Sequence, residues 1–213
     1  MEPLIHFQTP DKGALFVVTG ASGTGKTTLV KEAFSVLPEL KFSVSATTRA
    51  PRKGETDGVE YHFISLDEFE KMREQGNFLE WAKVYGNFYG TPRAPIEEAL
   101  LRGQSILLEI DVQGARSVRE KFPDSVLIFV LPPDLATIEG RLRHRSTDSE
   151  DIIQGRVDTA MLQISACGEF DYLVVNDDLA TAHVVFQSVL IGALCRRERR
   201  DMLVERMVGI SDT

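Results

Sequence analysis

The clearest pattern along the chain is a series of short apolar runs separated by longer polar or amphipathic stretches. Four such runs lie at residues 14–19, 105–111, 125–131 and 171–176. Apolar runs of this length are typical of strands that are buried on both faces of a parallel sheet. Because helical segments separate these strands, the pattern predicts an α/β fold with helices on both faces of a parallel sheet.

Helical periodicity fills most of the intervals between these runs. We expect helices at 28–37, 92–102 and 179–207, the last as one long helix that closes the chain. Pro92 and Pro95 fall in the first turn of the second helix, where proline is tolerated.

The segment 46–91 interrupts this alternation with a β-rich insert around a polar loop at 47–58. The elements expected in and just before the insert are a strand at 42–46, strands at 59–65 and 78–89, the latter broken by a turn at Gly86-Asn87, and a helix at 66–75 with Leu66, Phe69 and Met72 on one face.

Directly after the first apolar run the sequence matches the phosphate-binding P-loop, G-x-x-x-x-G-K-[ST]. Its glycines let successive backbone N–H groups point into one concavity, and the following helix adds its positive N-terminal end. Lys26 can reach the β and γ phosphates, and the Thr27 hydroxyl can hold Mg²⁺. A glycine-rich turn that carries a lysine by chance is disfavoured, because every fixed position is filled and a strand precedes the motif. The residues expected to bind a nucleoside triphosphate are Gly20, Ala21, Ser22, Gly23, Thr24, Gly25, Lys26, Thr27 and Thr28.

Composition narrows the class of partner. The chain has 213 residues and a formal net charge of −8, which disfavours non-specific binding to nucleic acid and favours a free mononucleotide. No apolar stretch approaches the ~20 residues that span a bilayer, so no membrane partner is expected. The start of the chain does not resemble a signal peptide, and Cys167 and Cys195 are too few for a disulfide framework. We therefore expect a cytoplasmic location; the oligomeric state stays open.

A second candidate site is the polar loop that contains Arg49 and Arg52. Two arginines three residues apart, stiffened by Pro51, suit bidentate contacts to a phosphate. The alternative is an exposed basic loop without a target. The presence of a P-loop in the same chain favours a phosphate-bearing acceptor.

Several separated blocks of the sequence resemble the guanylate kinase family of nucleoside monophosphate kinases. These blocks are 20–27, 43–52, 58–63, 78–82, 86–91, 108–114 and 175–178. The resemblance implies a P-loop kinase fold with a nucleotide-monophosphate-binding insert and a helical lid. It implies one discontinuous unit, with the core at 1–45, 92–133 and 161–213, the insert at 46–91 and the lid at 134–160. It also implies transfer of the ATP γ-phosphoryl group to GMP with Mg²⁺.

Carried over residue by residue, the resemblance places the GMP-binding residues in and around the insert. The phosphate ligands fall on Arg49, Arg52, Tyr61 and Tyr89, the guanine ligands on Ser45, Glu80, Thr91 and Asp111, and Glu55 supports the arginine loop. Guanine offers two adjacent N–H donors that a carboxylate such as Glu80 can accept together, whereas adenine does not. Without the resemblance, a solvated strand carboxylate and two half-buried strand tyrosines would be the simpler interpretation.

The resemblance also assigns arginines to the lid, at Arg141, Arg145 and Arg156, where they would neutralise charge in the transition state. With Lys26 and Arg49 they form the expected catalytic set. A solvated basic helix end is the alternative. The family usually has glycine on both sides of the middle arginine, where this chain has His144 and Ser146, and this difference concerns the flexibility of the lid.

The remaining expectations concern the metal and the base. Thr27 and Glu109 are expected at Mg²⁺, although Glu109 could simply end its strand, and Asn176 is expected near the adenine. No catalytic base is required, because the second pKa of a phosphate monoester lies near ~6. Two alternatives stay open: a non-catalytic guanylate-kinase-like binding module, and a related kinase with a different phosphate-bearing acceptor.

Overall fold

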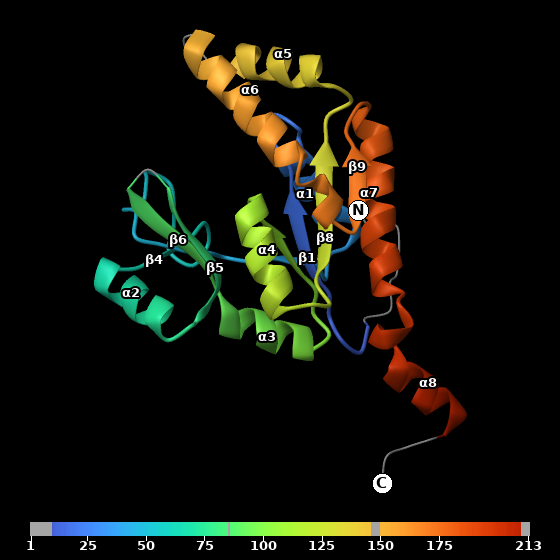
Figure 1. The fold of residues 1–213 in the computed structure, drawn as a ribbon. Coiled ribbons are helices and arrows are strands. Elements are labelled where there is room, and N and C mark those ends of the chain that lie inside the picture. The colour runs from blue at the N-terminus through green and yellow to red at the C-terminus, as the bar shows by residue number, and fades with distance from the viewer. Residues whose placement is uncertain (1–9, 85, 146–149, 210–213) are drawn as a thin grey trace.

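The structure is a computed structural model that describes residues 10–84, 86–145 and 150–209. Its core is a sheet of five parallel strands in the order β2-β7-β1-β8-β9 (Figure 1). In sequence order, these strands are β1 (Leu15–Thr19), β2 (Lys41–Phe42), β7 (Ile106–Glu109), β8 (Val126–Leu131) and β9 (Tyr172–Val175). The P-loop strand β1 is central, which places the residues that follow it in the middle of the carboxyl edge of the sheet.

Alternate residues of β1 face two separate parts of the core. Phe16 and Val18 belong to a buried cluster with residues of α1 (Lys26–Val36) and α7 (Leu179–Leu194). Leu15 and Val17 face the opposite side. There the buried residues come from α3 (Arg93–Leu101) and α4 (Val112–Lys121). Helices therefore cover both faces of the sheet, as the apolar runs predict.

A second, smaller sheet lies beside the core, with the strand order β4-β3-β6-β5 (Figure 1). Its elements are β3 (Ala46–Thr47), β4 (His62–Phe63), α2 (Leu66–Glu74), β5 (Phe78–Val84) and β6 (Asn87–Pro92). The Phe69 ring of α2 stacks on Phe78, with the ring centroids 4.5 Å apart, and on Phe88 at 5.3 Å. This aromatic stack is the core of the small sheet.

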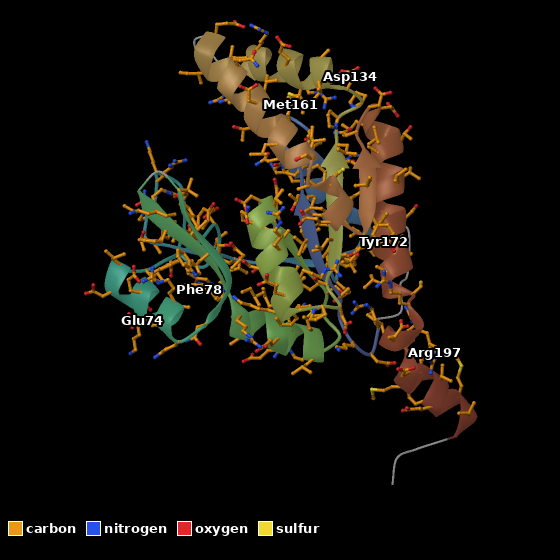
Figure 2. The ribbon with its side chains drawn as sticks, viewed as in Figure 1. Glu74, Phe78, Asp134, Met161, Tyr172 and Arg197 are labelled. Atoms are coloured by element: carbon orange, nitrogen blue, oxygen red, sulfur yellow. The ribbon has the colours of Figure 1, made fainter. Side chains whose placement is uncertain are left out.

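Two helices form an arm at the carboxyl edge of the core sheet (Figure 1). They are α5 (Leu135–Arg145), which follows β8, and α6 (Glu150–Ile164). Ile138 of α5 and Ala160 of α6 are buried with Ala21 of the P-loop. Figure 2 marks Asp134, where the arm leaves the sheet, and Met161 on α6. The arm is thus attached directly to the phosphate-binding loop.

The sequence prediction was wrong at two places where one element was expected. The segment 42–46 is not one strand: β2 pairs with β7 of the core sheet, whereas β3 pairs with β4 and β6 of the small sheet. The chain passes from one sheet to the other here, so neither strand can be longer.

The helix expected at 179–207 ends at Leu194, and η2 (Arg197–Arg199) and α8 (Asp201–Val208) follow. Arg199 lies in this interrupted segment. Its buried guanidinium donates to the carbonyl oxygens of Gly13 at 2.6 Å and Asp124 at 3.1 Å. These contacts fasten the C-terminal segment to the amino edge of the core sheet.

Smaller differences concern the small sheet. The strand expected at 59–65 is reduced to β4, because Gly58 forms a turn with φ +78° whose N–H bonds to the Tyr61 carbonyl oxygen. On α2, Phe69 is buried and Met72 packs beside it, but Leu66 is 51% exposed. Within the described ranges, no helix has both the length and the apolar character needed to cross a membrane.

Candidate active site

A cavity of about 1010 Å³ lies at the carboxyl edge of the core sheet. Three parts of the chain line it: the P-loop, the loop between β7 and α4, and helix α6 of the arm. Its lining includes the polar and charged side chains of Lys26, Thr27, Glu109, Asp111 and Arg156. Clefts at the carboxyl ends of parallel strands are the usual ligand sites of open α/β sheets.

The P-loop is shaped for the backbone to surround an anion. Gly25 precedes α1 with φ +88°, and a Cβ atom there would lie 2.2 Å from the Asn176 amide nitrogen, so only glycine fits. No side chain caps the N-terminus of α1. Its first N–H groups, which have no partner within the helix, are therefore available to a phosphate together with the positive end of the helix dipole.

Lys26 occupies the mouth of this loop. Its ammonium donates to the carbonyl oxygens of Gly20 at 2.5 Å and Ala21 at 3.0 Å. Burial lowers the pKa of Lys26, and the nearby Glu109 carboxylate partly offsets this effect. Because burial disfavours the charged form of Lys26, the negative charge of a bound phosphate would stabilise its ammonium here.

Thr27 and Glu109 supply oxygen atoms beside the same cavity. The Thr27 hydroxyl donates to the Glu109 carboxylate at 3.1 Å. In the part of the chain that the structure describes, no group of three or more His, Cys, Asp or Glu side chains could hold a metal by itself. Mg²⁺ is usually bound by one or two protein oxygens together with phosphates and water. The Thr27–Glu109 pair therefore suits Mg²⁺, and it does not suit a metal whose ligands all come from the protein.

Asn176 is hydrogen-bonded to the backbone of the P-loop. Its side chain is buried, and its amide nitrogen donates to the Thr24 carbonyl oxygen at 2.7 Å. The expected contact with adenine stays a prediction. What the structure adds is that Asn176 follows β9 and fixes the loop in which Gly25 lies.

The arm brings arginines to the same cavity. Arg141 of α5 donates to the carbonyl oxygens of Gly23 at 3.3 Å and Asn176 at 3.4 Å. Arg156 lines the cavity from α6. The side chains of Arg145 and His144, and all of Ser146, lie outside the described residues. Two of the three expected lid arginines are therefore placed around the P-loop.

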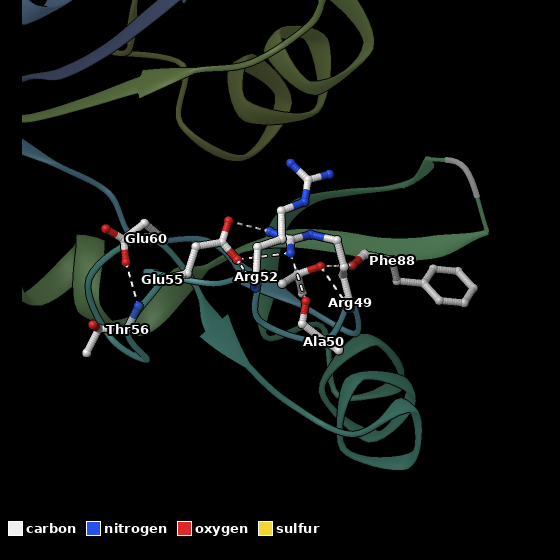
Figure 3. A network of polar contacts seen from close by, with 8 residues as sticks. Arg49, Ala50, Arg52, Glu55, Thr56, Glu60 and Phe88 are labelled. Atoms are coloured by element: carbon white, nitrogen blue, oxygen red, sulfur yellow. Dashed lines mark hydrogen bonds and ion pairs between the residues drawn. The ribbon is translucent and has the colours of Figure 1, made fainter.

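The second cationic site lies on the small sheet. Arg49 makes a bidentate pair with Glu55, at 3.0 and 2.8 Å (Figure 3). Its guanidinium also lies over the Tyr61 ring. Glu55 also accepts from the Arg52 backbone N–H at 2.6 Å. Arg49 and this N–H lower the pKa of Glu55, so the carboxylate stays charged and fixes the loop. The Arg52 guanidinium is exposed and points away from Glu55 (Figure 3), and Tyr89 packs edge to face on Tyr61.

The expected base-binding residues meet where the small sheet approaches α4. Thr91 of β6 donates a short hydrogen bond to the Glu80 carboxylate of β5. Burial raises the pKa of Glu80, and the nearby Asp111 carboxylate raises it further. Asp111 also caps α4 by accepting from the Gly114 N–H at 2.8 Å. Because Asp111 also lines the P-loop cavity, it connects the two halves of the site.

Ser45 is partly exposed just before β3, and its carbonyl oxygen accepts from the His62 N–H at 2.9 Å. It therefore lies at the junction of the core and the small sheet. One residue that sequence reasoning missed is Lys121, whose ammonium reaches the backbone beside Glu80. A lysine in the last turn of a helix normally only complements the helix dipole, so no sequence signal marked it.

These features define a class of protein: a P-loop kinase fold in which a parallel sheet carries the phosphate-binding loop and a small second sheet carries Arg49, Arg52 and the partly buried carboxylate of Glu80. Comparison with known proteins names the family. The family model described as guanylate kinase matches residues 12–192. The chain belongs to the guanylate kinase family.

Individual relatives agree over most of their length. The chain is 50% identical to the guanylate kinase of Carboxydothermus hydrogenoformans, over 88% of this chain and 92% of the relative. It is 52% identical to that of Rubrobacter xylanophilus, over 80% of this chain and 90% of the relative. The crystal structure of guanylate kinase from Anaplasma phagocytophilum matches with a TM-score of 0.72 at 31% identity, covering 96% of this chain and all of that chain. The expected α/β fold is confirmed.

Proposed function

We propose that this chain transfers the γ-phosphoryl group of ATP to GMP, giving ADP and GDP. Membership of the guanylate kinase family supports the reaction. The single structural observation that carries the proposal is the position of Glu80. This desolvated carboxylate lies with Thr91 beside Asp111, which itself lines the cavity of the P-loop.

Glu80 is suited to guanine by its charge and its partners. Guanine presents N1–H and the 2-amino group side by side, and one carboxylate can accept from both. Adenine has a lone pair at N1 and no amino group at C2, so it would leave Glu80 desolvated and unpaired. Sites that are built around such a hydrogen bond reject the wrong analogue by ~10⁴-fold or more.

The acceptor phosphate is assigned to the loop of Arg49 and Arg52, with the hydroxyl groups of Tyr61 and Tyr89. The Arg49–Glu55 pair supports this assignment, because it fixes one guanidinium and leaves the Arg52 guanidinium exposed. A fixed arginine loses little entropy when a phosphate binds. The loop would therefore both hold the acceptor and aim its attacking oxygen.

The donor phosphates are assigned to the P-loop amides, with Thr28 at the start of α1 and with Lys26 near the transferred group. Arg141 donates to the P-loop backbone, Arg156 lines the P-loop cavity, and Arg145 belongs to the same arm. Phosphoryl transfer spreads negative charge over the phosphate oxygens, so catalysis reduces to positioning and charge neutralisation. The acceptor oxygen is already anionic at neutral pH, so no general base is assigned.

The metal is assigned as Mg²⁺, with Thr27 and Glu109 as the residues that would hold it. When bound, Mg²⁺ would neutralise part of the charge of the donor phosphates. The hydrogen bond between Thr27 and Glu109 supports the assignment because it fixes two oxygens beside Lys26. Thr27 and Glu109 would thus have their oxygens in position before ATP binds.

We also assign moving parts to the chain: an acceptor-binding insert at 46–91 and a lid at 134–160, attached to a core at 1–45, 92–133 and 161–213. The separate small sheet and the arm support this division. Cys167 and Cys195 are free, which suits a cytoplasmic enzyme. The assigned partners are ATP and GMP, without nucleic acid or membrane.

A coupled assay of ADP formation tests the proposal. GMP, AMP, CMP and UMP are compared as acceptors with ATP and Mg²⁺, and product GDP is identified directly. We expect turnover with GMP and at least a thousand-fold lower kcat/KM with the other three. Binding of GMP without turnover would identify a non-catalytic module instead. A lack of both binding and turnover would indicate a different phosphate-bearing acceptor.

A further inference from the structure

The strand that carries Glu80 has an irregularity at the position of this residue. In the hairpin of β5 and β6, Phe78 is opposite Pro92, whereas Trp81 is opposite Gly90. Two residues of β5, Leu79 and Glu80, therefore face the single residue Thr91. This arrangement is a β-bulge, a feature that redirects a side chain and leaves part of the strand backbone without ladder partners.

Lys121 supplies partners for this backbone. It is the last residue of α4, and its ammonium donates to the carbonyl oxygens of Phe78 at 2.9 Å and Leu79 at 2.6 Å. Pro92, opposite Phe78, has no N–H to offer. Figure 2 marks Phe78 at the start of β5, where the small sheet comes close to α3 and α4. Lys121, on a helix that packs on the core sheet, thus hydrogen-bonds to the bulge of the small sheet.

The opposite end of α4 lies close to the Glu80 side chain. A Cβ atom added to Gly114, in the first turn, would lie 3.3 Å from one Glu80 carboxylate oxygen. Thr91 bonds to the other oxygen. Helix α4 therefore holds the Phe78 and Leu79 carbonyl groups, next to Glu80, through Lys121, and at Gly114 it leaves room for one Glu80 carboxylate oxygen.

We propose that Lys121 is a positioning residue for Glu80: by holding the bulge it aims the carboxylate at the acceptor base and sets the preference for bases with a 2-amino group. This inference rests on the proposed function. The Lys121 ammonium is bonded to backbone carbonyl oxygens and does not line the P-loop cavity, so the effect we assign to it is indirect and differs from that of Lys26.

Charge gives the proposal a second readout. The groups whose charge affects Glu80 are Asp111, which raises the pKa of Glu80, and Lys121, which lowers it. Glu80 must be ionised to accept two hydrogen bonds from guanine, so use of GMP declines as pH falls through its pKa. Without the Lys121 charge this pKa is higher, and the acidic limb of kcat/KM for GMP moves to higher pH.

The test compares Lys121→Met with Lys121→Arg and with Arg116→Met as a matched control. Arg116 lies on the same helix but pairs with Glu169, away from Glu80. The acceptors are GMP and IMP, which differ only in the 2-amino group. For Lys121→Met we expect kcat/KM for GMP to fall roughly ten-fold or more, that for IMP to fall less than three-fold, and KM for ATP to change less than two-fold. Lys121→Arg should restore the acidic limb, and Arg116→Met should match wild type.

The outcomes separate this inference from the proposed function. If wild-type protein forms no ADP with GMP, the proposed function fails. If it does, but Lys121→Met keeps the GMP-to-IMP ratio and the acidic limb of wild type, the assignment of Lys121 is overturned. An equal loss for both acceptors also overturns it, because that pattern reports a structural role. Should Lys121→Met not fold, Lys121→Gln, which keeps a donor without the charge, must still shift the acidic limb upward.

Discussion

Replacing Glu80 with glutamine changes one carboxylate oxygen to an amide nitrogen and preserves the shape of the side chain. In the structure, Thr91 donates to one Glu80 oxygen, and the other oxygen lies near Gly114. If the glutamine keeps its oxygen toward Thr91, its NH₂ group faces the guanine donors. If it turns over, it loses the bond from Thr91. In either orientation one charge-assisted hydrogen bond is lost.

The size of the effect follows from that single bond. A hydrogen bond to a charged group contributes about 1.5–3 kcal/mol, which corresponds to roughly a ten- to hundred-fold loss. We expect this loss in kcat/KM for GMP, mainly through KM. The KM for ATP should stay within two-fold, because Glu80 is on the small sheet and does not line the P-loop cavity.

Stability should change in the opposite direction to function. The pKa of Glu80 is raised in the folded state, so the fold favours the protonated form. That stabilisation is fully present below the unfolded value of ~4.3 and is lost as pH rises through the folded pKa. At pH 7 the ionised group therefore costs stability that glutamine does not, and Glu80→Gln should resist urea at least as well as wild type, with the difference disappearing near pH 4.

Coupled kinetics and urea unfolding at pH 4 and pH 7 measure both effects. An unchanged KM for GMP would refute the assignment of Glu80 to the base. A variant that is less stable than wild type at pH 7 would refute the reasoning about desolvation.

Three further substitutions test other parts of the site. Lys26→Met should lower kcat more than a hundred-fold. The protein should stay folded, because the Lys26 ammonium donates to P-loop carbonyl oxygens and not to the core. Retention of a tenth of wild-type kcat would contradict the role of Lys26. Arg49→Ala and Arg52→Ala should each raise KM for GMP roughly ten-fold by loss of a charge-assisted bond; steady-state changes below three-fold would mean that the loop faces solvent only. Arg199→Met should cost about 1–3 kcal/mol in urea unfolding, because the carbonyl oxygens of Gly13 and Asp124 lose their donor, while both KM values stay unchanged. An unaltered unfolding midpoint would rule out its role in fastening the C-terminal segment.

The parts of the fold that depend on local pattern could be predicted from the sequence. The apolar run 125–131 became β8 at Val126–Leu131, and the turn at Gly86-Asn87 separates β5 from β6. The P-loop motif is equally local as a pattern of residue types, although the close approach of Asn176 to Gly25 is a further, distant reason for glycine there. Each of these signals is contained in one short segment of the chain.

The parts that failed depend on distant residues. After the break at Leu194, the buried Arg199 donates to the carbonyl oxygen of Gly13, which is remote in the sequence. In the same way, the bulge at Glu80 has no signal in β5, because the donor for its carbonyl oxygens is Lys121 of another helix. The residue types at the site could be expected from the family resemblance, but the orientation of their side chains could not.

The central claim of this account is that two phosphate-bearing substrates are held on separate parts of the chain and brought together. Amide hydrogen exchange tests it most directly, in the free protein, with an ATP analogue, with GMP, and with a mimic in which a phosphate chain joins both nucleosides. We predict that GMP alone protects the loop at 49–61 and that only the joined mimic also protects 141–156. Strands β1, β7 and β8 are buried and should not change. Protection confined to the P-loop in every state would contradict the claim.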